Sequence, residues 1–149
     1  MAKIILNKGY GGFDVSTRAY KTYAERIGKE LFYYIGNYEY EEHHIVYKKV
    51  SYEDFLSRKT LFYFYSTQDL GEVITKDIVR EECDSELYLN EGHREDPLLI
   101  QIVEELGEEA SGWAGTLKVV EIPDELANGN YMVDDYDGWE NLHAKVEEY

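Results

Sequence analysis

Residues 94–110, REDPLLIQIVEELGEEA, form the stretch that decides the predicted fold. Asp96 is a favourable N-cap, and Pro97 follows at the first helical position, where no intrahelical N–H is needed. Beyond Pro97 the apolar residues recur at the spacing of one face of an α-helix, namely Leu99, Ile102, Val103, Leu106 and Ala110. Acidic residues occupy the opposite side. The stretch therefore predicts a helix over 96–110 with one face in the core and an acidic face in water.

A second amphipathic helix follows a glycine-rich loop near the N-terminus. Residues 3–6 predict a short strand, and residues 9–13, GYGGF, predict a flexible loop. Ser16 is the expected N-cap of the helix, and Gly28 fits the left-handed position that ends many helices. A strand, a glycine loop and a helix in this order can present backbone N–H groups to an anion. The same order is also an ordinary way for a chain to change direction.

The middle of the chain is predicted to be mostly strand. Runs of β-branched and aromatic residues predict strands at 31–35, 45–50, 61–65 and 72–75. A short helix is expected at 51–57, with Tyr52, Phe55 and Leu56 facing inward.

The C-terminal third is predicted to contain a hairpin and a final helix. Residues 116–122 form a clear strand pattern, and Asn128-Gly129 is a strong turn signal. Residues 131–134 should then return as the hairpin partner of the strand at 116–122. Residues 139–148 should form a short helix. The whole pattern predicts an α+β fold: a small, mostly antiparallel sheet, two main amphipathic helices and a C-terminal β-hairpin. The length of 149 residues predicts a single domain, 1–149.

Charge and composition limit the classes of function. The chain has 31 acidic and 15 basic residues, a net charge of −16, so direct binding to nucleic acid or to a membrane surface is not expected. Basic partners would be attracted. The 15 tyrosines suit a ring-stacking pocket, an interface of a homo-oligomer, or simply the strands of a small sheet. With no signal sequence and no long apolar run, the protein is expected in the cytoplasm.

Catalytic, metal and cofactor signatures are not found. The single cysteine, Cys83, excludes an internal disulfide framework and stands among carboxylates that oppose a thiolate. Three aspartates and a glutamate surround Gly138, but their spacing does not match a calcium-binding EF-hand loop. No nucleophile or zinc-hydrolase motif is present. We therefore expect no metal, no cofactor and no enzymatic activity.

Several short segments carry a family resemblance: Asn7 with 10–13 (YGGF), 94–97 (REDP) with 103–107 (VEELG), 120–124 (VEIPD) and 136–140 (YDGWE). Together they resemble a family of small, uncharacterised bacteriophage proteins. Residues 31–90 share no such likeness and look like a variable, insertion-like middle region. The resemblance implies a phage origin, and phage accessory proteins of this kind commonly redirect or disarm the host. It implies no particular activity.

The first functional hypothesis is a phage protein that counters host defence by sequestering a nucleotide-like small ligand. Aromatic rings would stack on a base, arginines would bind phosphate, and backbone N–H groups of the glycine loop and the helix start would assist. The predicted site consists of Tyr10, Gly11, Gly12, Phe13, Arg18, Arg94, Asp96 and Trp139. The alternative for Arg94 is that it merely pairs with a carboxylate.

The second hypothesis is an acidic DNA mimic that occupies the basic cleft of a host nuclease or DNA-binding protein. The acidic face of the central helix would contact the partner through Glu104, Glu105, Glu108 and Glu109. Such binding should weaken as salt rises. The alternative is an acidic face that is only solvated.

Overall fold

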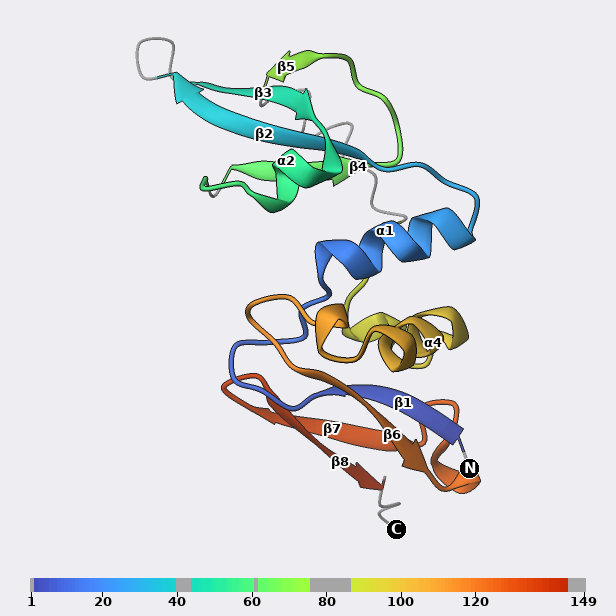
Figure 1. Ribbon diagram of the computed structural model, residues 1–149. Coiled ribbons are helices and arrows are strands. Elements are labelled where there is room, and N and C mark those ends of the chain that lie inside the picture. The colour runs from blue at the N-terminus through green and yellow to red at the C-terminus, as the bar shows by residue number, and fades with distance from the viewer. Residues whose placement is uncertain (1, 40–43, 61, 76–86, 145–149) are drawn as a thin grey trace. The chain divides into compact units, whose positions relative to one another are not determined.

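The computed structural model describes residues 2–39, 44–60, 62–75 and 87–144, and the chain divides into two compact units (Figure 1). Unit 1 is Met1–Tyr23 with Leu89–Tyr149, and unit 2 is Ala24–Tyr88. Unit 2 is therefore inserted into the sequence of unit 1. The α+β class and the C-terminal β-hairpin are confirmed, whereas the single domain stays a prediction.

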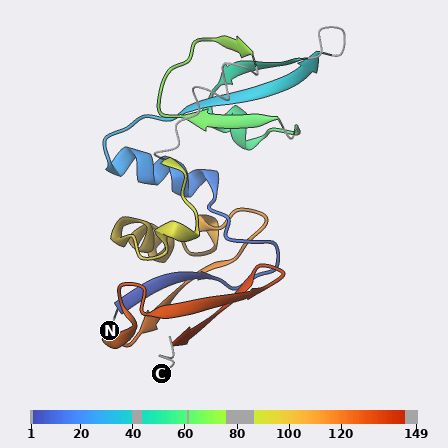
Figure 2. The same cartoon turned by 180° about the vertical axis from the view of Figure 1, so that it is seen from behind.

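Unit 1 is built from three layers. Strands β1 (Ala2–Asn7) and β6 (Leu117–Ile122) pair antiparallel, with Ala2 opposite Ile122. Helix α4 (Pro97–Leu106) covers one face of this pair, and the hairpin of β7 (Tyr131–Tyr136) and β8 (Trp139–Ala144) covers the other (Figures 1 and 2). The described residues of the unit also contain the short 3-10 turns η2 (Glu91–His93), η3 (Gly107–Ala110) and η4 (Asp124–Leu126).

The sequence of β1 follows from its place between helix α4 and the β7–β8 hairpin. Ile4 and Leu6 point toward the hairpin, where they form a buried cluster with Ile122 and Tyr131. Ile5, on the opposite side of the strand, is also fully buried. A strand covered on both faces has apolar residues in succession rather than in alternation, and the run of Ile and Leu in β1 follows this rule.

Helix α4 begins as predicted but ends earlier. The Asp96 carboxylate accepts the Leu98 N–H at 2.9 Å, Pro97 stands in the first turn, and the helix buries Leu99, Ile102 and Val103. The predicted extent to residue 110 is wrong. Gly107 has a φ of 60°, in the left-handed region that ends α-helices, and Ala110 is buried from the 3-10 turn that follows.

The predicted C-terminal pairing is also wrong in detail. Strand β6 pairs with β1, not with residues 131–134, and residues 139–144 form strand β8 instead of a helix. The hairpin turn is Asp137-Gly138, whose φ values of 49° and 90° are those of a two-residue primed turn. That turn fixes the partner of β7 as the strand immediately after it. Residues 145–149 lie outside the described residues.

The described residues of unit 2 form a four-stranded antiparallel sheet, with the short helix α2 (Tyr52–Leu56) beside it. Its strand order is β4-β2-β3-β5, and the strands are β2 (Phe32–Glu39), β3 (His44–Val50), β4 (Tyr63–Ser66) and β5 (Val73–Thr75). They correspond to the four predicted strands, but β2 continues to Glu39, four residues past its predicted end at 35.

Helix α2 (Tyr52–Leu56) is capped by Ser51 and buries Phe55. The expectation that Leu56 faces inward is wrong, because its side chain is 51% exposed. A helix of five residues makes little more than one turn, and Phe55 is the residue that this turn buries.

Helix α1 (Thr17–Arg26) begins in unit 1, and Ser16 Oγ accepts the Ala19 N–H, as the predicted N-cap should. Gly28 has the predicted positive φ, 77°. Cys83 lies outside the described residues. No helix in the described part of the chain has the length and apolar composition needed to cross a membrane.

Candidate functional site

Three loops lie side by side at one edge of unit 1 (Figure 1, blue, orange and red segments). They are residues 8–14, residues 111–116 and the hairpin turn 137–138. The Gly11 N–H donates to the Asp137 carbonyl at 2.8 Å, and the Gly112 N–H donates to the Asp14 carbonyl at 2.9 Å. The first loop is therefore held between the other two.

Asn7 connects the three loops from the end of β1. Its fully buried side chain donates to the carbonyls of Gly9 at 2.9 Å and Gly138 at 2.6 Å. Its oxygen accepts the Thr116 N–H at 2.8 Å. One amide side chain thus satisfies backbone groups from all three segments, which orders loops that would otherwise be free to move.

Arg94 and Glu140 form a buried ion pair beside Asn7, the residue that acts as the hub of the three loops. Nη2 of Arg94 lies 2.8 Å from Oε2 of Glu140, and the two side chains are only 11% and 10% exposed. Glu140 Oε1 also accepts the Asn7 N–H at 2.7 Å. The Ile5 N–H donates to the Arg94 carbonyl at 2.9 Å, and Arg94 Nη1 donates to the Ile5 carbonyl at 3.0 Å.

These bonds close the outer edge of β1. The Lys8 N–H donates to the Thr116 carbonyl, so the antiparallel pattern turns the backbone groups of Ile5 and Asn7 away from β6. Arg94 satisfies the N–H and carbonyl of Ile5, and Glu140 accepts the N–H of Asn7. The alternative interpretation of Arg94, that it pairs with a carboxylate, therefore agrees with the structure. The guanidinium is not directed at a ligand.

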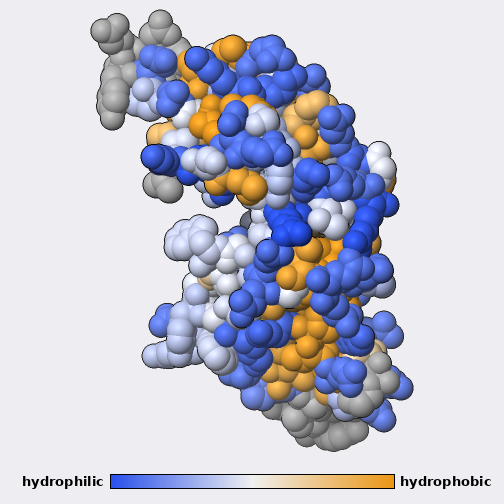
Figure 3. Space-filling model, viewed as in Figure 1, coloured by the Kyte–Doolittle hydropathy of each residue, from blue (hydrophilic) through white to orange (hydrophobic). Residues whose placement is uncertain are grey.

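Four aromatic side chains project from the three loops, and we call this group the aromatic edge: Tyr10, Trp113, Tyr136 and Trp139. Trp113 is 91% exposed, Tyr136 73% and Tyr10 65%. The rings of Tyr10 and Trp139 are in contact, with centroids 5.6 Å apart and planes tilted by 44°. Residues of intermediate hydropathy gather at this flank of unit 1 in the space-filling view (Figure 3).

The hairpin places its aromatic residues by strand alternation. Tyr136 and Trp139 are directly paired across the turn, so they share the outward face with Asp134. The inward face carries buried Tyr131 and Glu140. Asp134 pairs with His143 at 2.7 Å, while Asp135 and Asp137 are exposed.

The predicted ligand residues are brought together only in part. Tyr10, Gly11, Gly12 and Trp139 converge: a Cβ on Gly138 would lie 2.6 Å from the Gly12 nitrogen. Phe13 lies beneath the Arg94 guanidinium, 5.5 Å from its carbon to the ring centroid.

Arg18 and Asp96 lie elsewhere and are engaged. Arg18 pairs with Glu109 at the surface. Asp96 caps α4 and accepts the Tyr23 hydroxyl at 2.5 Å. Burial raises the pKa of Tyr23 to about 12, and the hydrogen bond to Asp96 adds to the effect, so this hydroxyl keeps its proton.

The predicted acidic face is exposed but partly neutralised. Glu104 pairs with Lys3 at 3.0 Å, and Glu109 pairs with Arg18. Glu105 and Glu108 are exposed as well. Exposed pairs of this kind contribute little to stability and exchange readily with a partner's charges.

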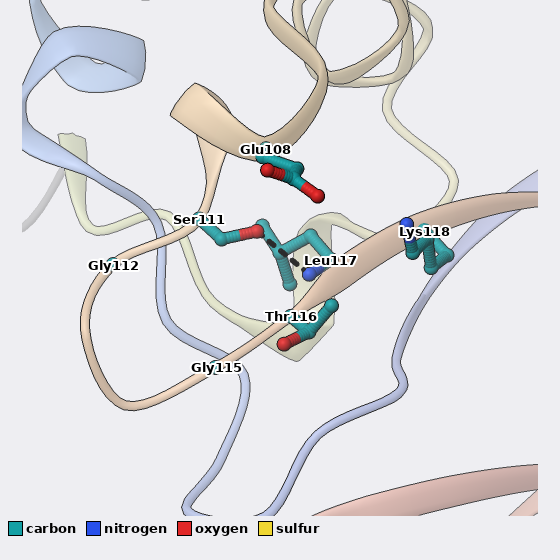
Figure 4. A pocket seen from close by; sticks show the side chains of 7 residues that line it. All are labelled: Glu108, Ser111, Gly112, Gly115, Thr116, Leu117 and Lys118. Carbon is teal, nitrogen blue, oxygen red and sulfur yellow. Dashed lines mark hydrogen bonds between the residues drawn. The ribbon is translucent and has the colours of Figure 1, made fainter.

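A hollow of about 190 Å³ lies behind the second loop (Figure 4). Its lining includes Glu108 and the hydroxyls of Ser111 and Thr116. Ser111 Oγ accepts the Leu117 N–H at 2.8 Å. Small-molecule sites typically measure roughly 300–1,000 Å³, so this hollow is too small to enclose a nucleotide.

Among the described residues, no three His, Cys, Asp or Glu side chains are grouped so that they could hold a metal ion. Sequence reasoning missed Asn7 as the hub, Glu140 as the Arg94 partner and Trp113 as an exposed ring. The exposure of Trp113 could have been predicted, because the flanking Gly112 and Gly115 indicate a turn and not a core element.

Comparisons with protein-family models, with curated proteins and with solved structures found no match for this chain. The resemblance to the phage family stays a prediction.

Proposed function

We propose that this chain is a non-enzymatic binding protein that attaches through the aromatic edge to a basic surface of another protein. The observation that carries the proposal is the exposure of the edge, above all of Trp113 at 91%. Tyr and Trp are the residues most enriched at the energetic centres of protein interfaces, whereas a solvated loop gains nothing from exposing an indole ring.

Charge supports a basic partner. The net charge of −16 attracts cationic proteins and repels nucleic acid and anionic surfaces. Asp135 and Asp137 carry part of this charge next to Tyr136. The proposal keeps the inhibitor hypothesis from the sequence but moves its contact surface from α4 to the aromatic edge. In the phage setting, the partner would be a basic host protein in the cytoplasm.

Nucleotide sequestration has less support. The Tyr10–Trp139 ring pair favours it, but both arginines assigned to phosphate already have carboxylate partners: Arg94 has buried Glu140, and Arg18 has Glu109 at the surface. A phosphate at the edge would also be repelled by the exposed Asp137 carboxylate in the turn. Sequestration stays a prediction.

The test is capture of partners from a bacterial extract on the immobilised protein, followed by mass spectrometry under native conditions. We expect basic proteins that are released as salt rises. The double variant Trp113→Ala/Tyr136→Ala should capture at least about tenfold less, since two such anchors each contribute over 1 kcal/mol.

The matched control is Tyr88→Ala, which removes a tyrosine of unit 2 that is 64% exposed and should change nothing. A small retained mass instead of a protein would favour sequestration. Equal capture by the double variant and the wild type would reject the aromatic edge.

A further inference from the structure

We propose that Tyr10, Tyr136 and Trp139 form an anchor site for an arginine side chain of the partner. This inference rests on the proposed function and names the chemistry that the aromatic edge recognises. It arises from two features in one place: ring faces on which no cation of the described residues stacks, and a free carboxylate in the turn beside them.

The ring faces are open. In the described part of the chain, cations stack on other rings: Arg58 lies 3.9 Å from the Tyr63 centroid, and Arg94 lies above Phe13. None stacks on the three anchor rings. Lys8, the nearest lysine in sequence to Tyr10, donates to the Glu140 carbonyl at 2.5 Å.

The Asp137 carboxylate is also open. Asp137 is exposed and forms no ion pair within the described residues. Asp137 immediately follows Tyr136 in the turn, and its carbonyl holds Gly11, next to Tyr10. A cation above the rings would therefore find a carboxylate within the same turn.

Guanidinium fits this combination better than ammonium. It is planar, so it can lie flat on a ring while its edge donates two N–H groups to a carboxylate. An ammonium group is a compact, strongly hydrated charge with no flat face to stack on a ring, so it gains less from this combination.

The probe is a blocked peptide of alternating glycine and arginine, compared with matched peptides in which lysine or citrulline replaces arginine. Citrulline keeps the shape of arginine without its charge. The readout is the pair of indole N–H signals in the NMR spectrum, because the chain has 2 tryptophans and Trp113→Phe assigns them.

We expect the Trp139 signal to shift on titration with the arginine peptide and to shift more than the Trp113 signal. Affinity should fall about tenfold with citrulline and less with lysine, as the range for cation–π contacts implies. Tyr10→Leu should weaken binding several-fold, Tyr10→Phe should lose less because it keeps the ring, and Tyr88→Leu in unit 2 should behave as wild type.

Equal binding of citrulline and arginine peptides, or full affinity in Tyr10→Leu, would overturn the anchor site. If the capture experiment still yields basic proteins that need Trp113 and Tyr136, the proposed function survives that failure. If arginine binds as expected and no protein is captured, the anchor site stands and the proposed function falls.

Discussion

At the scale of single residues, the Arg94–Glu140 pair determines how the edge of unit 1 is held. Both charged side chains are almost completely buried, and the two residues together bond the N–H and carbonyl of Ile5 and the N–H of Asn7. An open strand edge invites pairing with another chain. The pair therefore protects the edge of β1 from pairing with another chain. It also holds β8, which carries Glu140 and Trp139, against β1.

Replacing Arg94 with alanine should lower the free energy of unfolding by about 3–5 kcal/mol, because it leaves the Glu140 carboxylate buried without its cation. Urea denaturation followed by tryptophan fluorescence measures the change. Arg18→Ala is the control: its pair with Glu109 is exposed, and its loss should cost no more than about 1 kcal/mol. Equal losses in both variants would show that burial of the Arg94 pair is unimportant.

At the scale of elements, the sequence predicted what local chemistry determines. The start of α4 was predictable because Asp96 and Pro97 act within one turn. The partners of β1 were not, since its pairing joins Ala2 to Ile122 and depends on the packing of the whole unit. For the site, Tyr10 and Trp139 were predicted together as rings of one pocket, whereas the Glu140 partner of Arg94 required the register of β8.

The turn of the hairpin is the element on which the aromatic edge depends most. Gly138 has a φ of 90°, and an added Cβ would lie 2.6 Å from the Gly12 nitrogen. Gly138→Ala should therefore push the first loop away from the turn and separate Tyr10 from Trp139. We expect a changed Trp139 indole signal and a loss of stability beyond the cost of left-handed backbone.

Gly129→Ala is the matched control for this change. Gly129 has a similar φ, 82°, but a Cβ there would meet no atom within 4 Å. It should lose only the intrinsic cost of a left-handed alanine, about 1–2 kcal/mol, with the Trp139 signal unchanged. A Gly138→Ala variant no less stable than Gly129→Ala, with the Trp139 signal unmoved, would contradict the tight loop contact.

At the scale of the whole molecule, the sequence of unit 2 interrupts that of unit 1. Unit 1 has its own buried cluster of Ile4, Leu6, Ile122 and Tyr131, and unit 2 has a separate one around Tyr34. Within unit 1 the segments on either side of the interruption are joined directly, because the Tyr20 hydroxyl bonds to the backbone N–H and carbonyl of Leu89 at 3.0 and 3.1 Å.

This arrangement predicts that unit 1 folds without unit 2. Replacing residues 27–86 with a short glycine–serine linker should preserve the positions of the Trp113 and Trp139 indole signals, since both tryptophans belong to unit 1. The shortened chain should also keep its affinity for the arginine peptide, because every anchor residue is retained. The same shortened chain in concentrated urea supplies the unfolded reference. Indole signals that collapse to that reference would show that the two units fold as one domain, as the chain length alone suggested.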